Sequence, residues 1–254
     1  MLVKNEIPIL EYDDAKDAVI NADHEHLNVR FPKRAVFAFL GDVTDIYCRE
    51  HHAEVIAYFE SITKKYPLYL LKENGEEYCM IQAPAGAAAA SQIMDWLIAY
   101  GVKKIISTGS CGVLCDLKEN TFLVPYKALR DEGTSYHYLP PSRFVDISSD
   151  ARNAIESVLN AHNLPYSEVI TWSTDGFFRE TKEKVAYRKS EGCQTVEMEC
   201  AALAACSEMR NCLFGMILYT ADTLADCENY DERGWGNDSK EAALRLSIES
   251  VLQL

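Results

Sequence analysis

The sequence lacks three features that would point to other classes of protein. Its nine cysteines include no C-x-x-C pair, so neither a disulfide framework nor a zinc site is indicated. No apolar run reaches the roughly 20 residues that a membrane-spanning helix needs. A formal net charge of −14 argues against binding nucleic acid polymers, because their phosphates are neutralised by lysine and arginine. We therefore expect reduced and mostly buried cysteines, no membrane or nucleic acid partner, and no metal or other cofactor.

Linkers, repeats and low-complexity tracts are also missing. With 254 residues, 48% of them hydrophobic, the chain is long enough for one domain spanning residues 1–254. The start, MLVKNEIPILEYDDAK, does not show the basic-then-apolar order of a signal peptide, so a cytoplasmic location is expected. Residues 1–34 are polar and are expected to wrap around the outside of the domain.

Short apolar runs alternate with helical patterns along the rest of the chain. Strands are expected at residues 35–40, 78–85, 103–108, 121–125, 169–173 and 213–220, and helices at 45–62, 86–100, 148–162, 181–190, 197–208 and from 239 onward. Two irregular segments are expected, a turn at 109–112 and a long loop at 126–142. This order predicts an α/β layer architecture.

The stretch from Thr195 to Asp226 combines a helix of small residues, a buried strand and acidic side chains. Glu197, Met198 and Glu199 are expected at the helix start, and Asp222 just beyond the carboxyl end of the strand, where open α/β sheets bind ligands. The helix dipole alone favours acidic residues in a first turn, and an aspartate commonly shapes a turn. Spacing alone therefore leaves a functional and a purely structural interpretation equally open.

Several motifs in the same order resemble the nucleoside phosphorylase family. They are V-E-M-E-C-A-A-L followed by Y-T-A-D, the turn G-S-C-G, and the loop R-D-E-G-T-S-Y-H-Y-L-P-P. This family includes purine nucleoside phosphorylases, uridine phosphorylases and methylthioadenosine/S-adenosylhomocysteine nucleosidases. The resemblance implies a single three-layer α/β domain, with a central mixed sheet partly curled into a barrel and helices on both faces. It also implies a homodimer, or a hexamer built as a trimer of dimers.

Cleaving a nucleoside C1′–N bond requires groups that hold the ribose hydroxyls and neutralise the departing base. By resemblance, Asp222 matches the acid that protonates purine N7. The implied sugar-binding residues are Met198 and Glu199, with His26 reaching the 5′-hydroxyl in a neighbouring subunit. The implied base-binding residues are Cys111, Gly112, Phe177, Phe178 and Glu197. Arg233 is a further candidate to assist the acid, and Arg179 is a candidate donor to the base.

The phosphate-binding residues depart from the family pattern. Asp45 and Ser107 stand where two arginines are expected, and an aspartate facing phosphate reverses an interaction worth about 3 kcal/mol at 5 Å. The remaining candidate phosphate-binding residues are Gly41, Ser110, Lys64 and Arg130. Lys64 corresponds to a cation that a neighbouring subunit supplies. Arg130 is a candidate phosphate ligand, but a surface ion pair with Asp131 or Glu132 is the favoured interpretation.

The family resemblance favours an enzyme that cleaves a purine nucleoside by phosphorolysis, giving the free base and a pentose 1-phosphate. Thr181 and Glu183 replace the Gln/Arg pair that reads uracil in uridine phosphorylases, whereas Asp222 is typical of purine enzymes. Three alternatives remain: hydrolysis without phosphate, a uridine phosphorylase-like activity, and a nucleoside-binding module with little turnover. The expected partners are therefore a nucleoside and, for phosphorolysis, phosphate.

Overall fold

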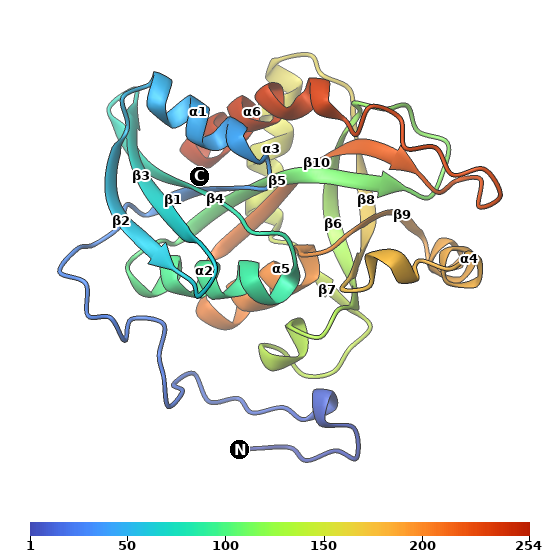
Figure 1. Ribbon diagram of the computed structural model, residues 1–254, viewed down its shortest axis with the longest axis horizontal. Helices are drawn as coiled ribbons and strands as arrows, with labels where there is room; N and C mark the ends of the chain where they lie inside the picture. The colour runs from blue at the N-terminus through green and yellow to red at the C-terminus, as the bar shows by residue number, and fades with distance from the viewer.

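Ten strands form one continuous sheet in the computed structural model, which describes all 254 residues (Figure 1). The strands are β1 (Arg34–Ala38), β2 (Glu54–Glu60), β3 (Lys65–Glu73), β4 (Glu76–Gln82), β5 (Lys104–Val113), β6 (Phe122–Asp131), β7 (Phe144–Asp146), β8 (Tyr166–Thr174), β9 (Cys193–Glu197) and β10 (Leu213–Thr223). The α-helices are α1 (Asp42–Glu50), α2 (Ala87–Ala99), α3 (Ser149–Ala161), α4 (Lys182–Ser190), α5 (Cys200–Arg210) and α6 (Lys240–Gln253). Four short 3₁₀ helices lie at Pro8–Leu10, Ser135–His137, Phe177–Arg179 and Asn237–Ser239.

Five of the strands close into a ring. They follow the order β10-β6-β8-β9-β5, and β5 pairs again with β10. The sheet then continues from β5 through β1, β4 and β3 to β2 as an open, mixed sheet. This arrangement confirms the prediction of a mixed sheet that is partly curled into a barrel.

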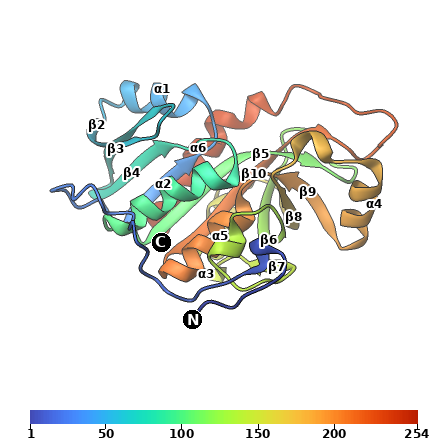
Figure 2. The same cartoon turned by 60° about the horizontal axis from the view of Figure 1, so that its bottom comes forward.

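Helices cover the sheet on both sides, as predicted. Figure 1 shows α1, α3 and α6 together on one side of the sheet, and Figures 1 and 2 show α2 and α5 side by side on the other. Along β1 the side chains alternate: Ala35 and Phe37 join the core under α2 and α5, while Val36 and Ala38 join the core under α6. Because a strand alternates its faces, one short apolar run supplies both cores.

The alanine-rich helix α5 is buried through most of its length, from Cys200 to Ser207. Its small side chains allow close approach to the barrel strands, which confirms the interpretation of this stretch. The boundary differs from the prediction, however. Glu197 is the last residue of β9 and Glu199 is the N-cap of α5, so the helix begins after both glutamates. Asp222 lies within β10 rather than beyond its end.

Residues 45–62 do not form one helix, and that prediction was wrong. Helix α1 ends at Glu50, His52 adopts a positive φ of 50°, and the chain continues as β2. The segment VIAYF in β2 is rich in β-branched and aromatic residues, which favour a strand. Pairing with β3 then overrides any helical preference.

Two further boundaries differ from the predictions because strands extend through segments expected to be irregular. The G-S-C-G segment at 109–112 lies inside β5, which pairs with β10 as far as Val113. The first part of the 126–142 segment continues β6 to Asp131, because β8 pairs with it over its whole length. The strands β3, β7 and β9 had no counterpart among the predicted elements.

The segment before β1 lies mostly on the outside, as predicted, with Phe31 buried as its anchor (Figure 1). Seven of the nine cysteines are buried, also as predicted. No helix has both the length and the apolar character required to cross a bilayer.

Candidate active site

A cavity of about 250 Å³, here called the inner cavity, lies where the carboxyl-terminal parts of β5, β9 and β10 meet. Eight residues selected from the sequence line it: Ser110, Cys111, Gly112, Phe177, Glu197, Met198, Glu199 and Asp222. Other lining residues, including Glu180 and Trp235, were not predicted. The barrel therefore brings together acidic, thioether and aromatic side chains from segments that are far apart in sequence.

Glu199 points into this cavity from the N-cap of α5 and is almost fully buried. Its Oε1 accepts a hydrogen bond from the Gly86 amide at 2.5 Å, at the start of α2. Burial, together with the charge of Glu197, raises the pKa of Glu199 to about 8. One carboxyl oxygen is thus held by the protein, and the other is available to a ligand.

Glu197 lies beside Glu199, but its carboxyl group is engaged by the protein. Oε2 accepts from the amides of Glu199 and Cys200, each at 2.7 Å. Oε1 accepts from the hydroxyls of Ser173 at 2.5 Å and Thr171 at 3.3 Å. With these four bonds Glu197 fastens the start of α5 to β8 and β9. It also lines the inner cavity, so its role as a base-binding residue stays a prediction.

Glu197→Ala is expected to reduce the free energy of unfolding by about 3 kcal/mol, because two helix-start amides and two hydroxyls lose their acceptor. Chemical denaturation of both proteins measures this difference. Glu197→Gln retains an acceptor oxygen and should lose less. Equal stability of the alanine variant and the wild type would contradict the assignment.

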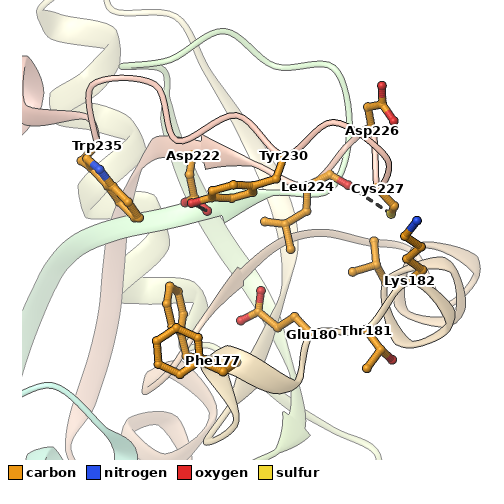
Figure 3. Close-up of a pocket in the computed structure, with 12 residues that line it drawn as sticks. Phe177, Glu180, Thr181, Lys182, Asp222, Leu224, Asp226, Cys227, Tyr230 and Trp235 are labelled. Atoms are coloured by element: carbon orange, nitrogen blue, oxygen red, sulfur yellow. Dashed lines mark hydrogen bonds between the residues drawn. The ribbon is translucent and has the colours of Figure 1, made fainter.

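Asp222 faces the same space from β10 and has two neighbours that sequence reasoning missed. The Tyr230 hydroxyl donates to Asp222 Oδ2 at 3.2 Å. Figure 3 shows Glu180 on the opposite wall, with its carboxyl group directed toward the space below Asp222 and Tyr230. Burial raises the pKa of Asp222 and, together with the charge of Asp222, raises that of Glu180 to about 7. Together with Glu199, the cavity therefore holds three acids that retain protons more readily than ordinary carboxyl groups.

Gly112 forms the wall against which the Asp222 carboxyl group rests. A Cβ atom at this position would lie 3.0 Å from Leu224 Cδ1, 3.0 Å from Val196 Cγ1 and 3.2 Å from Asp222 Oδ1. Glycine is therefore required here for space rather than for an unusual backbone angle.

Gly112→Ala should displace the Asp222 carboxyl group and lower kcat/KM by about 100-fold, since misplacement of a catalytic group by about 1 Å has an effect of that size. Steady-state kinetics measures the change, and thermal unfolding shows whether the variant remains folded. Gly133→Ala is a matched control, because a Cβ there meets nothing closer than 3.7 Å. Unchanged kinetics in Gly112→Ala would contradict the contact.

The charges of the inner cavity are all of one sign. Four carboxylic acids line it, namely Glu180, Glu197, Glu199 and Asp222, and no lysine, arginine or histidine does. Such a lining favours a ligand with hydrogen-bond donors, or one that develops positive charge, over an anion.

The fold and this site can be compared with known proteins. A family model described as the phosphorylase superfamily matches residues 33–252. The chain belongs to the phosphorylase superfamily. Its relatives include nucleoside phosphorylases and nucleosidases, so it is an enzyme of a family that cleaves N-glycosidic bonds.

Three similar proteins illustrate the range of similarity. Uncharacterized protein R802 of Acanthamoeba polyphaga mimivirus is 26% identical over 65% of this chain, which spans only 64% of that protein's length. A guanosine phosphorylase from Halorubrum lacusprofundi is 23% identical over 75% of this chain and 82% of its own. The crystal structure of AMP nucleosidase from Bacteroides thetaiotaomicron shares the fold, with a TM-score of 0.71, 22% identity and coverage of 88% and 89% of the two chains.

The candidate phosphate-binding residues of the superfamily are dispersed in this chain. Ser110 lies in the inner cavity, but Gly41 and Lys64 do not line it. Gly41 is the N-cap of α1, with φ 58°, and Lys64 is exposed and donates to Gln82 Oε1 at 2.6 Å.

Arg130 is not available as a phosphate ligand, and the surface ion pair suggested for it does not form either. Its guanidinium is buried and donates to Ser135 Oγ, Ser142 Oγ and the carbonyls of Leu139 and Pro140. Arg130 therefore fastens the loop after β6.

The two residues that replace the expected arginines are also engaged by the protein. Asp45 Oδ1 accepts from the Tyr69 hydroxyl at 3.1 Å, and Ser107 Oγ donates to the Phe37 carbonyl at 2.7 Å. Ser107 is fully buried between β1 and β10. Neither position presents a cation to the inner cavity.

The other predicted site residues differ in how close they come to the cavity. Phe177 lines it, whereas Phe178 is 91% exposed and contacts Phe177 edge-on at 4.9 Å. Both phenylalanines are exposed, so neither belongs to the hydrophobic core. Cys111 is buried and lines the cavity, while His26 lies on the exposed N-terminal segment.

The candidate arginines do not line the cavity. Arg233 donates to the carbonyls of Leu117 and Ala221. Tyr230, rather than Arg233, donates to Asp222. Arg179 also lies outside the lining, which includes the adjacent Glu180 instead.

Proposed function

We propose that this chain cleaves the N-glycosidic bond of a purine nucleoside with water as the acceptor of the sugar. The observation that carries the proposal is the lining of the inner cavity, with four carboxylic acids and no cation. Phosphate is a mixture of monoanion and dianion at neutral pH, and the inner cavity offers acidic side chains but no cation to balance its charge. Water carries no charge and needs no cation.

Asp222 and Glu199 then have distinct roles in the reaction. Asp222, with its raised pKa, donates a proton to N7 of the departing purine. Glu199 binds the ribose hydroxyls through the oxygen that Gly86 does not occupy, and Met198 packs against the sugar. The cluster of carboxyl groups stabilises the oxocarbenium character that develops at C1′ as the bond breaks.

A purine is favoured over uracil by the residues around the base position. Asp222 provides an acid for N7, and Phe177 provides an aromatic face for stacking. The positions of the uracil-reading pair are held by Thr181 and Glu183. Thr181 caps α4 by accepting from the Lys184 amide, and Glu183 does not line the inner cavity.

Phosphorolysis is the second candidate, and the exposed cation Lys64 favours it. Lys64 and His26 lie on the surface of this chain, where a second subunit can contact them, although Lys64 donates to Gln82 within the chain itself. The Halorubrum relative is named as a phosphorylase. The assembly would then be a homodimer, or a hexamer of three dimers, and we propose a cytoplasmic location for either activity.

Chromatography of the products formed from adenosine, guanosine, inosine, uridine and methylthioadenosine, with and without phosphate, tests the proposal. Release of purine without phosphate, together with free pentose, is the expected result. Strict dependence on phosphate and formation of pentose 1-phosphate would overturn hydrolysis. In that case Lys64→Ala should raise the KM for phosphate, while Lys65→Ala, which removes an adjacent exposed cation paired with Glu60, should not. Tight nucleoside binding without turnover would identify a binding module.

A further inference from the structure

A second cavity of about 600 Å³, here called the outer cavity, adjoins the inner one. The two share Phe177, Glu180, Asp222 and Trp235, so they meet at the two acids. Volumes of roughly 300 to 1,000 Å³ accommodate drug-sized ligands. The outer cavity therefore offers room for a substantial chemical group in addition to the contents of the inner cavity.

The walls of the outer cavity are mainly apolar. Figure 3 shows Phe177 on the wall formed by the segment before α4, and Leu224, Cys227 and Tyr230 on the wall formed by the segment after β10. Phe178 and Val185 also line the cavity. At the rim, Lys182 pairs with Glu228 and so links the two walls. An apolar interior with a charged rim matches a flexible, uncharged substituent better than a phosphate or a second sugar.

The position of Asp222 fixes which part of a purine would enter this cavity. On a purine, N7 and the substituent at C6 lie on the same edge. If Asp222 donates to N7, the C6 substituent is directed past Asp222 toward Glu180, where the inner cavity opens into the outer one.

Glu180 supplies a hydrogen-bond acceptor at this junction. Its carboxyl group has no hydrogen-bond or ion-pair partner within the protein, although Lys184 contributes some favourable charge. An acceptor that is half-buried and unpaired is suited to an N–H group of the ligand.

We propose that the substrates are purine nucleosides whose 6-amino nitrogen carries an apolar substituent. The substituent fills the outer cavity, and the remaining N–H donates to Glu180. This inference rests on the proposed function, because it assumes that the purine is the group bound beside Asp222.

Three ribosides test the inference: adenosine, N6-benzyladenosine and 6-benzyloxypurine riboside. We expect kcat/KM for the N6-benzyl compound to exceed that for adenosine at least 10-fold, since burial of several apolar carbons contributes that much. The benzyloxy compound has the same shape without the N–H and should react more slowly than the benzylamino compound. A lower kcat/KM for N6-benzyladenosine than for adenosine would overturn the use of the outer cavity. Equal values for the two benzyl compounds would overturn the role of Glu180.

A pair of cysteine variants links the effect to the outer cavity. Cys227→Trp should lower the ratio of kcat/KM for N6-benzyladenosine over adenosine at least 10-fold, because the indole occupies the cavity. Cys115→Trp changes the other partly buried cysteine, which lies outside both cavities, and should preserve the ratio. A preserved ratio in Cys227→Trp would contradict the inference.

Binding of the free bases, measured by calorimetry, shows whether the outer cavity binds the substituent even if the protein does not cleave ribosides. If no riboside is cleaved, the proposed function fails. The assignment of the outer cavity to the N6 substituent then still stands if N6-benzyladenine binds at least 10-fold more tightly than adenine, and if Cys227→Trp abolishes the difference. Equal binding of the two bases would overturn it.

Discussion

Asp222→Asn is expected to lower kcat/KM for a purine nucleoside by about 100- to 10,000-fold, the range observed when general acid catalysis is removed. Asparagine preserves the size of the side chain and can still accept the Tyr230 hydrogen bond. It cannot transfer a proton to N7, so the purine must depart as an anion. Steady-state rates of base release for the two proteins measure the effect.

A substrate with an activated leaving group provides the control. In a nitrophenyl riboside the leaving group departs from the sugar as a stable nitrophenolate and needs no proton. Asp222→Asn should therefore retain most of the wild-type rate with this substrate. Equal losses with the nitrophenyl and purine ribosides would mean that the variant disturbs the site as a whole, and would contradict the assignment of Asp222 as the acid.

The pH dependence has a definite sign. Burial raises the pKa of Asp222, whereas the hydrogen bond from Tyr230 lowers it by stabilising the carboxylate. Activity that needs protonated Asp222 should fall as the pH rises through this pKa. Tyr230→Phe removes the stabilising bond, so the falling limb should move to higher pH. If kcat/KM of Tyr230→Phe instead begins to fall at a lower pH than that of the wild type, Asp222 is not the group whose ionisation causes the fall.

How much of the site was predictable depends on whether its residues lie in continuous motifs. Met198, Glu199 and Asp222 belong to short motifs on β9, α5 and β10, and the barrel brings all three to one cavity. Local sequence also indicated the helix α3, whose N-cap Ser148 accepts from the Ala151 amide. In both cases the relevant information is local, which is why it could be read before the structure.

The residues that were missed depend on long-range folding. Glu180 follows a 3₁₀ turn, and Tyr230 and Trp235 lie in a polar loop that folds back over β10. No periodicity marks these positions, because their contacts are set by packing between distant segments. The hydrogen bonds of Arg130 could not be predicted for the same reason. Nothing in the local sequence indicates that the loop after β6 would accept the hydrogen bonds of this guanidinium.

Glu199→Gln is the second change with a large expected effect. The carboxyl oxygen not bonded to Gly86 is the proposed acceptor for the ribose hydroxyls. In assays above about pH 8, where Glu199 is ionised, a hydrogen bond to this charged group contributes about 1.5 to 3 kcal/mol. We therefore expect kcat/KM to fall about 10- to 100-fold. The wild type should discriminate strongly against 2′-deoxy and 3′-deoxy nucleosides, whereas the variant should discriminate weakly. Undiminished discrimination in Glu199→Gln would show that another group holds the sugar.

The same substitution should alter how stability depends on pH. The pKa of Glu199 is about 8 in the folded protein, whereas an ordinary glutamate has a pKa of 4.5. Between these two pH values the folded state therefore binds a proton that the unfolded state does not. The stabilisation is complete below pH 4.5 and is lost as the pH rises through about 8. The Glu199→Gln variant has no titratable group at position 199. Its melting temperature should therefore fall less steeply than that of the wild type as the pH rises from 4.5 to about 8. A wild-type melting temperature that rises from pH 5 to pH 8, with no difference in slope in the variant, would mean that Glu199 stays ionised in the folded protein and that its burial is offset by a cation from another subunit.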